Sequence, residues 1–188
     1  MRKQSTADSL TWGYSKENAK GNNQSPVAIL SKDVFKDPAL LPWFTGYDPG
    51  AAKNIRNTGK ILRIAFDDTF DRSGNLSLIR GGVDSEWANS ILVTANKGKE
   101  APFPNFDPSI LFPQNRSYYT YQGSFTMPPC EECVTWIVMK EPMTVDEQQM
   151  LKLRSLSSNS AEDPHCPLQD NWRPLQPLNN RMIRSTCQ

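Results

Sequence analysis

The stretch YQGSFTMPPCEECVTWIVMKEP, from Tyr121 to Pro142, carries the strongest fold signal in this chain. Its part Cys133–Met139 is apolar at nearly every position, which is typical of a central strand covered on both faces. The same stretch holds Cys130 and Cys133, two of the four cysteines, in a Cys-x-x-Cys spacing. This spacing occurs in zinc knuckles, in redox dithiols and in pairs of thiols that only pack.

The surroundings of the two cysteines favour reduced, structural thiols. Residues i and i+3 of an extended chain face opposite sides, so a strand that begins at Cys133 separates the two sulfur atoms. A redox dithiol prefers a helix N-terminus, whereas a strand follows here. Glu131 and Glu132 would raise a thiol pKa rather than lower it. Counting alone leaves open a Cys3His zinc site, whose further candidates are Cys166, Cys187 and His165.

The bulk composition predicts an ordinary globular domain. The chain has 188 residues, of which 37% are hydrophobic and 22% are charged, and its net charge is +1. This balance predicts neither a nucleic-acid partner nor a membrane partner. We expect a loose tail over residues 1–11 and one domain over residues 12–188. The N-terminal residues lack the apolar run of a secretory signal, so the expected location is cytoplasmic.

Periodicity predicts more strands than helices. KILRIAFDD, residues 60–68, alternates between apolar and polar positions, and NLSLIRGG, residues 75–82, predicts a second strand. The clearest helix is predicted for TVDEQQMLKLRSL, residues 144–156, where Thr144 and Glu147 have the spacing of a capping box. The predicted class is therefore mainly β, with α+β character.

Motif searches for catalysis find little. The only histidine of the sequence, His165, lies in a polar loop between prolines, which is more typical of a solvated side chain than of a catalytic base. There is no G-x-S-x-G, P-loop or Rossmann motif. The acidic pairs consist of residues adjacent in sequence, whose side chains usually point in different directions. They are therefore more typical of solvated charges than of a catalytic acid/base couple.

A series of motifs, in order, resembles the α-class carbonic anhydrases. The N-terminal motifs are WGYSKEN, GNNQSPVAI, NTGK, FDDTFDRS and LIRGG, and the C-terminal ones are FDPSILFPQNRSYYTYQGSFTMPPCEECVTWIVMKEPMTVDEQQMLKLRSL and NWRPLQPLNNRMIRS. They cover most of residues 12–82 and 98–186. NTGKILR, GSFT and PPCEECVTW are most similar to the cytosolic, muscle-type isoform three of the family. The resemblance implies a large, mostly antiparallel, twisted sheet with few short helices.

The resemblance also implies a reaction that this chain lacks the residues to perform. The family hydrates CO2 reversibly to bicarbonate and a proton, using a zinc ion that three histidines hold and that lowers the pKa of its bound water. Those histidines should follow LIRGG. Here LIRGG leads into VDSEWANSILVTANKGKEAPF, and the family pattern resumes at KGKEAPF. We therefore expect the central strands to be deleted at a shortened junction near residues 83–97, no bound zinc, and no catalysis.

Several residues match the family's functional positions and are expected to be vestigial. Thr126 matches the threonine that orients the zinc-bound hydroxide, Lys60 matches the proton-shuttle position, and Arg63 matches a basic position nearby. The positions of the substrate pocket are Phe125, Thr126, Met127, Val134 and Trp136. Packing left over from the family fold explains these residues without any retained function.

Three roles for such a chain stay open. It can be an inactive member of a zinc-lyase (carbonate dehydratase) family whose substrates are CO2 and bicarbonate. It can be an acatalytic binding module that engages a protein partner, as in the carbonic anhydrase-related proteins. It can also be a splice or gene-model variant without a function of its own. Loss of central strands predicts self-association, because strands without neighbours recruit other chains.

Overall fold

The computed structural model describes residues 18–46, 48–67 and 93–187. The chain divides into two compact units. The first unit takes in the chain up to Leu41, Ser117–Lys140 and the chain from Trp172 onward, and the second takes in Pro42–Arg116 and Glu141–Asn171. The predicted strand at residues 75–82, the predicted tail and most of the predicted junction lie outside the described residues.

The described residues are mainly β, as predicted. Short 3-10 helices span Asn18–Lys20, Ser31–Asp33, Pro49–Ala51 and Pro108–Leu111. The strands are β1 (Val34–Lys36), β2 (Ala52–Asn57), β3 (Leu62–Phe66), β4 (Glu100–Pro102), β5 (Tyr118–Gly123), β6 (Val134–Met139) and β7 (Ile183–Ser185), and the α-helix α2 spans Glu147–Arg154. None of the described helices is long and apolar enough to cross a membrane.

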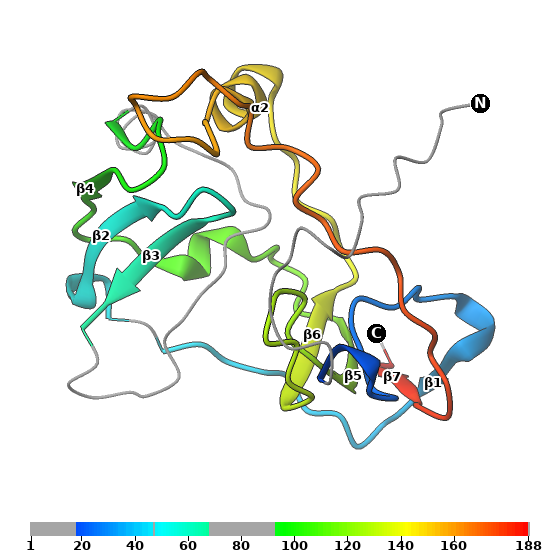
Figure 1. The fold of residues 1–188 in the computed structure, drawn as a ribbon. Coiled ribbons are helices and arrows are strands. Elements are labelled where there is room, and N and C mark those ends of the chain that lie inside the picture. Colours follow the sequence, from blue (N-terminus) through cyan, green and yellow to red (C-terminus); the bar gives the residue numbers. More distant parts are fainter. Residues whose placement is uncertain (1–17, 47, 68–92, 188) are drawn as a thin grey trace. The chain divides into compact units, whose positions relative to one another are not determined.

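The first unit is built on a sheet with the strand order β1-β7-β5-β6 (Figure 1). Strands β5 and β6 pair antiparallel from Tyr118 opposite Met139 to Gly123 opposite Val134, whereas β1 and β7 run parallel. The buried core on this sheet consists of Val27, Tyr121 and Ile183. Trp136 and Val138 of β6 pack against this core from the edge of the sheet.

The prediction that Cys133–Met139 is a central strand covered on both faces is wrong for the described residues. β6 is the last strand of its sheet, and β5 is its only described partner. Its burial alternates, because Val134, Trp136 and Val138 are half-buried, the last two against the core, while Thr135 and Ile137 are exposed. An apolar run therefore does not by itself distinguish a central strand from a strand at the edge of the described sheet.

The second unit contains the sheet β3-β2-β4, in which both pairings are antiparallel. The alternation read from residues 60–68 is confirmed, because β3 places Ile64 at 0% exposure, with Leu62 and Phe66 packed against the same core. The buried cluster on this sheet comprises Ala52, Ile55, Ile64, Ala101, Phe103, Phe106, Leu111 and Leu156. Full burial of one such aliphatic side chain contributes about 1.5–3 kcal/mol.

Helix α2 is confirmed, but its predicted cap is wrong. The N-cap is Asp146, whose side chain accepts a hydrogen bond from the backbone N–H of Gln149, and the Gln149 side chain accepts one from the N–H of Asp146. This capping box lies two residues later than the predicted pair Thr144 and Glu147. Both pairs have the required spacing, and the asparagine and aspartate class is at least as good an N-cap as threonine.

Candidate functional site

The site that the sequence indicates is a loop in the first unit, between β5 and β6. The loop folds back on itself, because Phe125 N–H donates to Glu131 O at 3.0 Å and Cys130 N–H donates to Met127 O at 2.9 Å. Cys130 is buried with a φ of 60°, and Phe125 is exposed. Thr126 and Met127 are half-buried between them.

Two serines far apart in sequence hold the start of this loop. Ser25 N–H donates to Ser124 Oγ at 3.0 Å, and Ser124 N–H donates to Ser25 Oγ at 3.1 Å. Both serines are fully buried. Tyr121 donates its hydroxyl to Ser25 Oγ, and Trp136 donates its indole N–H to Ser124 O at 3.0 Å. The N-terminal segment is thereby joined to β5 and β6 through polar contacts.

Gln24 and Glu132 hold the far end of the loop. Gln24 Nε2 donates to Cys130 O at 3.2 Å and to Glu132 Oε1 at 2.7 Å, and Asn23 N–H donates to the same oxygen at 2.8 Å. The hydrogen bond from Gln24, together with those from Asn23, keeps the pKa of Glu132 below its ordinary value, although partial burial acts in the opposite direction. Glu132 is therefore a carboxylate at neutral pH.

Two arginines from the C-terminal segment complete the polar network. Arg173 donates to Gln24 Oε1 at 2.8 Å and to Ser25 O at 2.9 Å. Arg181 donates to Gln24 O at 2.8 Å and to Gln122 O at 3.1 Å, and it also donates to the carbonyls of Pro177 and Leu178. Partial burial lowers the pKa of Arg181, yet the guanidinium stays charged at any physiological pH.

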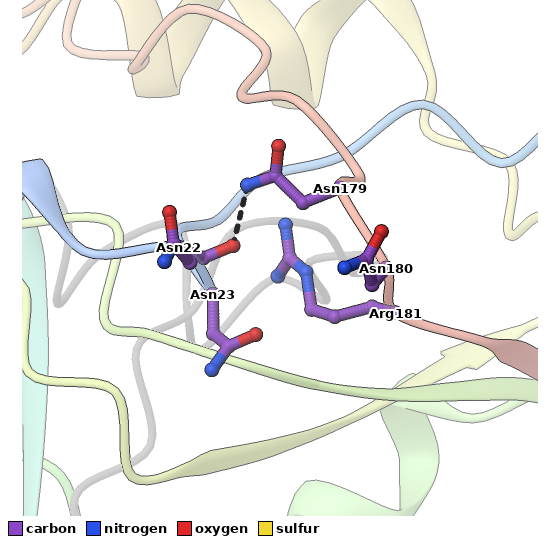
Figure 2. Close-up of a pocket in the computed structure, with 5 residues that line it drawn as sticks. All are labelled: Asn22, Asn23, Asn179, Asn180 and Arg181. Carbon is purple, nitrogen blue, oxygen red and sulfur yellow. Dashed lines mark hydrogen bonds between the residues drawn. The ribbon is translucent and has the colours of Figure 1, made fainter.

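A polar cavity of about 320 Å³ lies beside Arg181, lined by Asn22, Asn23, Asn179, Asn180 and Arg181. Figure 2 shows these side chains, with the Asn179 amide donating to Asn22 O at 2.7 Å. The carbonyl partners of Arg181 show that its main task is to join chain segments. We assign no ligand to this cavity.

The residues present do not fit the family's zinc centre. The sequence contains one histidine. It is His165, an exposed side chain of the second unit whose Nε2 lies 3.1 Å from Ser155 O. All four cysteines are free, and among the described residues no three His, Cys, Asp or Glu side chains lie close enough to hold a metal ion. The Cys3His alternative therefore finds no geometric support in the described part of the chain.

The structure brings part of the predicted site together. Phe125, Thr126 and Met127 follow β5, and Val134 and Trp136 lie half-buried on β6, where the Trp136 ring stacks on Tyr121 at 6.3 Å between centroids. All five belong to the first unit.

Lys60 and Arg63, the other two predicted residues, belong to the second unit. Lys60 lies in the turn between β2 and β3, and its carbonyl accepts a hydrogen bond from the Asn171 side chain at 2.7 Å. Arg63 is exposed on β3 opposite Arg56. Within this unit, neither position contributes to a described cavity.

Sequence reasoning missed Gln24, Ser25, Arg173 and Arg181, which organise the loop. Each acts across a long separation, such as 99 positions between Ser25 and Ser124 and 149 between Gln24 and Arg173. Periodicity reports only local structure. The motifs GNNQSPVAI and NWRPLQPLNNRMIRS contained these residues, but nothing in the motifs themselves shows that they meet.

The family model for eukaryotic-type carbonic anhydrases matches residues 84–187. The chain belongs to this family. Among curated relatives it is similar to carbonic anhydrase 3 of Homo sapiens, with 39% identity over 258 aligned positions that cover 93% of this chain and 98% of the relative. Carbonic anhydrase 3 of Rattus norvegicus and of Equus caballus are 38% and 37% identical with the same coverage.

The length of these alignments is informative by itself. An alignment of 258 positions exceeds the 188 residues of this chain, so at least 70 positions of it (258 less 188) have no counterpart here. The relatives are nevertheless covered almost from end to end. The unmatched positions are therefore mostly internal.

Proposed function

We propose that this chain is a carbonic anhydrase-family protein that does not hydrate CO2. The observation that carries the proposal is the single histidine of the sequence. Carbonic anhydrases are the standard example of a zinc ion held by three histidines, which lowers the pKa of bound water to near 7. One imidazole on an exposed loop cannot replace that ligand set.

The internal gap supports the same conclusion. The unmatched positions fit the loss of one central section between LIRGG and KGKEAPF, at the junction near residues 83–97. We propose that residues 12–188 form a shortened version of the family domain and that residues 1–11 precede it as a tail. The family's substrates, CO2 and bicarbonate, would then not be turned over. By analogy with the muscle-type isoform, we place the protein in the cytoplasm.

The residues at the family's functional positions are proposed to be structural here. Trp136 donates to Ser124 O and stacks on Tyr121, so its position is explained by packing. Thr126 has no metal-bound hydroxide to orient, and Lys60 has no proton to transfer. Phe125, Met127 and Val134 line no described cavity, and Arg63 lies on an exposed strand face.

Zinc content and CO2 hydration of the purified protein test this proposal. We expect zinc far below one ion per chain after mild dialysis, and a hydration rate equal to the buffer background. Human carbonic anhydrase 3, prepared in the same way, is the positive control. Stoichiometric zinc together with a hydration rate that a sulfonamide abolishes would show that the proposal is wrong.

A protein-binding role is the second candidate, and exposed apolar side chains in the first unit favour it. Trp172 and Leu175 are each 66% exposed and Met182 is 62% exposed. A contiguous exposed apolar patch marks a contact surface, whereas single exposed apolar side chains are ordinary, so the role requires these side chains to act as one patch. Capture experiments with the wild-type chain and with a Trp172→Ala, Leu175→Ala variant test the role, which requires one defined partner that the variant loses.

A further inference from the structure

The free edge of β6 goes beyond the proposed loss of catalysis, because it is a surface built for pairing. Within residues 18–46, 48–67 and 93–187, only β5 pairs with β6, and β6 ends the sheet. The strand spans six residues, Val134–Met139. Backbone N–H and C=O groups on its outer side therefore have no ladder partner in the described structure.

The alternation of hydrogen-bonded pairs between β5 and β6 shows which main-chain groups of β6 point toward the free edge. Lys140 N–H donates to Ser117 O at 2.9 Å, which continues the β5–β6 ladder by one position. Hydrogen-bonded and non-hydrogen-bonded pairs alternate in an antiparallel ladder, so the main chains of Val134, Trp136 and Val138 face β5. Those of Thr135, Ile137 and Met139 face the free edge.

The pairing of β5 with β7, on the other side of β5, confirms this alternation. Thr186 N–H donates to Tyr118 O at 3.1 Å, so the main chain of Tyr118 faces β7. Its partner on β6, Met139, is accordingly in a non-hydrogen-bonded pair. The outward set is thus fixed by two independent bonds.

The edge lacks the features that protect natural edge strands. From Cys133 to Met139 it contains no charge, no proline and no glycine. The register with β5 runs without a bulge along the whole strand. Proteins that must avoid edge pairing place lysine, proline or a bulge there. This strand is instead rich in β-branched and aromatic residues, which form favourable cross-strand pairs.

We propose that the outer edge of β6 pairs antiparallel with β6 of a second copy of this chain. The alternating outward groups of one strand are complementary to those of an identical strand turned by a two-fold rotation. The charges at the strand ends favour this direction. An antiparallel pair places Glu132 of one copy near Lys140 of the other, whereas a parallel pair would place like charges together. Both side chains keep their partners within the chain, because Glu132 accepts from Gln24 and Asn23 and the Lys140 ammonium donates to Thr186 O at 2.7 Å, so the attraction acts across solvent rather than through a new ion pair.

The same charges select a register. Pairing Thr135 with Ile137 of the other copy joins outward-facing groups and puts the two-fold axis beside Trp136. Glu132 then lies opposite Lys140 of the other copy. One position farther out, Glu131 faces Glu141, and both are exposed, so solvent screens that repulsion. A contact of one strand pair buries less than the roughly 1,200 Å² of standard interfaces, so we expect a weak, concentration-dependent dimer.

Sedimentation equilibrium over a wide range of protein concentration tests the proposal. We expect wild-type protein to pass from monomer to dimer as concentration rises. Ile137→Lys places a charge on the edge, and Ile137→Pro removes an outward N–H while leaving the bonds to β5 intact. Both variants should remain monomeric. The matched control is Gln122→Lys, an exposed position on the same sheet face but on the interior strand β5, opposite Thr135.

The proposal holds if Gln122→Lys dimerises like wild type and both Ile137 variants do not, with near-UV circular dichroism showing folded protein throughout. A wild-type chain that is monomeric at every concentration overturns it, and would mean that another segment of the same chain covers the edge. Dimers that persist in both Ile137 variants also overturn it. None of these readouts depends on zinc or on CO2 hydration, so this inference and the proposed function fail independently.

Discussion

At the scale of single residues, Gly123 is required by a close approach rather than by an unusual backbone angle. A Cβ atom at this position would overlap Ser25 Oγ and would lie 2.9 Å from Trp136 Cδ1. We expect Gly123→Ala to lower the free energy of unfolding by about 1–3 kcal/mol, as overpacking of a tight site does. Urea unfolding followed by circular dichroism measures the change. Gly46→Ala is the control, because nothing lies within 4 Å of its Cβ position.

Glu132 should make stability depend on pH in the acid range. Hydrogen bonds from Gln24 and Asn23 keep its pKa in the folded chain below the ordinary value of 4.5. A lowered pKa in the folded state stabilises the protein above about pH 4.5, and this contribution is lost as the pH falls through the folded value. The stability difference between wild type and Glu132→Gln should therefore be constant near neutral pH and shrink below pH 4.5. A difference that grows on acidification would contradict the assignment.

At the scale of elements, the N-cap of α2 in the structure differs from the N-cap that the sequence pattern predicts. Asp146→Ala removes the observed N-cap and should cost about 1 kcal/mol in the free energy of unfolding, within a range of about 0.5–2. Thr144→Ala removes the residue that the pattern proposed, and as an exposed substitution it should change stability by less than about 0.5 kcal/mol. Thermal unfolding of the two variants decides between the caps. Equal losses would mean that Thr144 shares the capping role.

The elements also show how far the sequence alone could go. The strand β3 and the helix α2 were predictable because their patterns are local, and β3 alternates as a half-buried strand does. The position of β6 was not predictable from its apolar run. Whether such a strand is central depends on which neighbours exist, and the described neighbour is β5 alone. The pairs Thr144–Glu147 and Asp146–Gln149 both have the spacing of a capping box, so the sequence alone does not show which of them caps α2.

At the scale of the whole molecule, the family resemblance located the loop after β5, but the contacts that hold it needed the structure. Gln24 reaches this loop at Cys130 over 106 positions, and Arg173 holds Gln24 in turn over 149 positions. No local pattern encodes such contacts. The lack of a set of three histidines, by contrast, could be predicted from composition, because the sequence contains one histidine.

The two units differ in how much apolar surface they bury. In the described residues, the buried cluster of the first unit consists of Val27, Tyr121 and Ile183, with partly buried neighbours. That of the second unit contains eight residues, and six of them have large side chains: Ile55, Ile64, Phe103, Phe106, Leu111 and Leu156. Burial contributes about 25 cal/mol per Å² of apolar surface, whereas one hydrogen bond contributes about 1 kcal/mol net. Judged by its apolar core alone, the first unit is therefore the less stable of the two.

We expect the first unit to open at lower free energy than the second, and the chain to melt below human carbonic anhydrase 3. Domains are stable by only about 5–15 kcal/mol, so the proposed loss of central strands would remove a large share of that margin. Hydrogen exchange read by mass spectrometry measures each unit separately, because local opening sets the exchange rate of buried amides. Amides of β5 should exchange faster than those of β2, at a protein concentration low enough to keep the chain monomeric. Equal rates in both strands, with one sharp melting transition at the temperature of the intact relative, would show that the two units unfold together and that the small core of the first unit suffices.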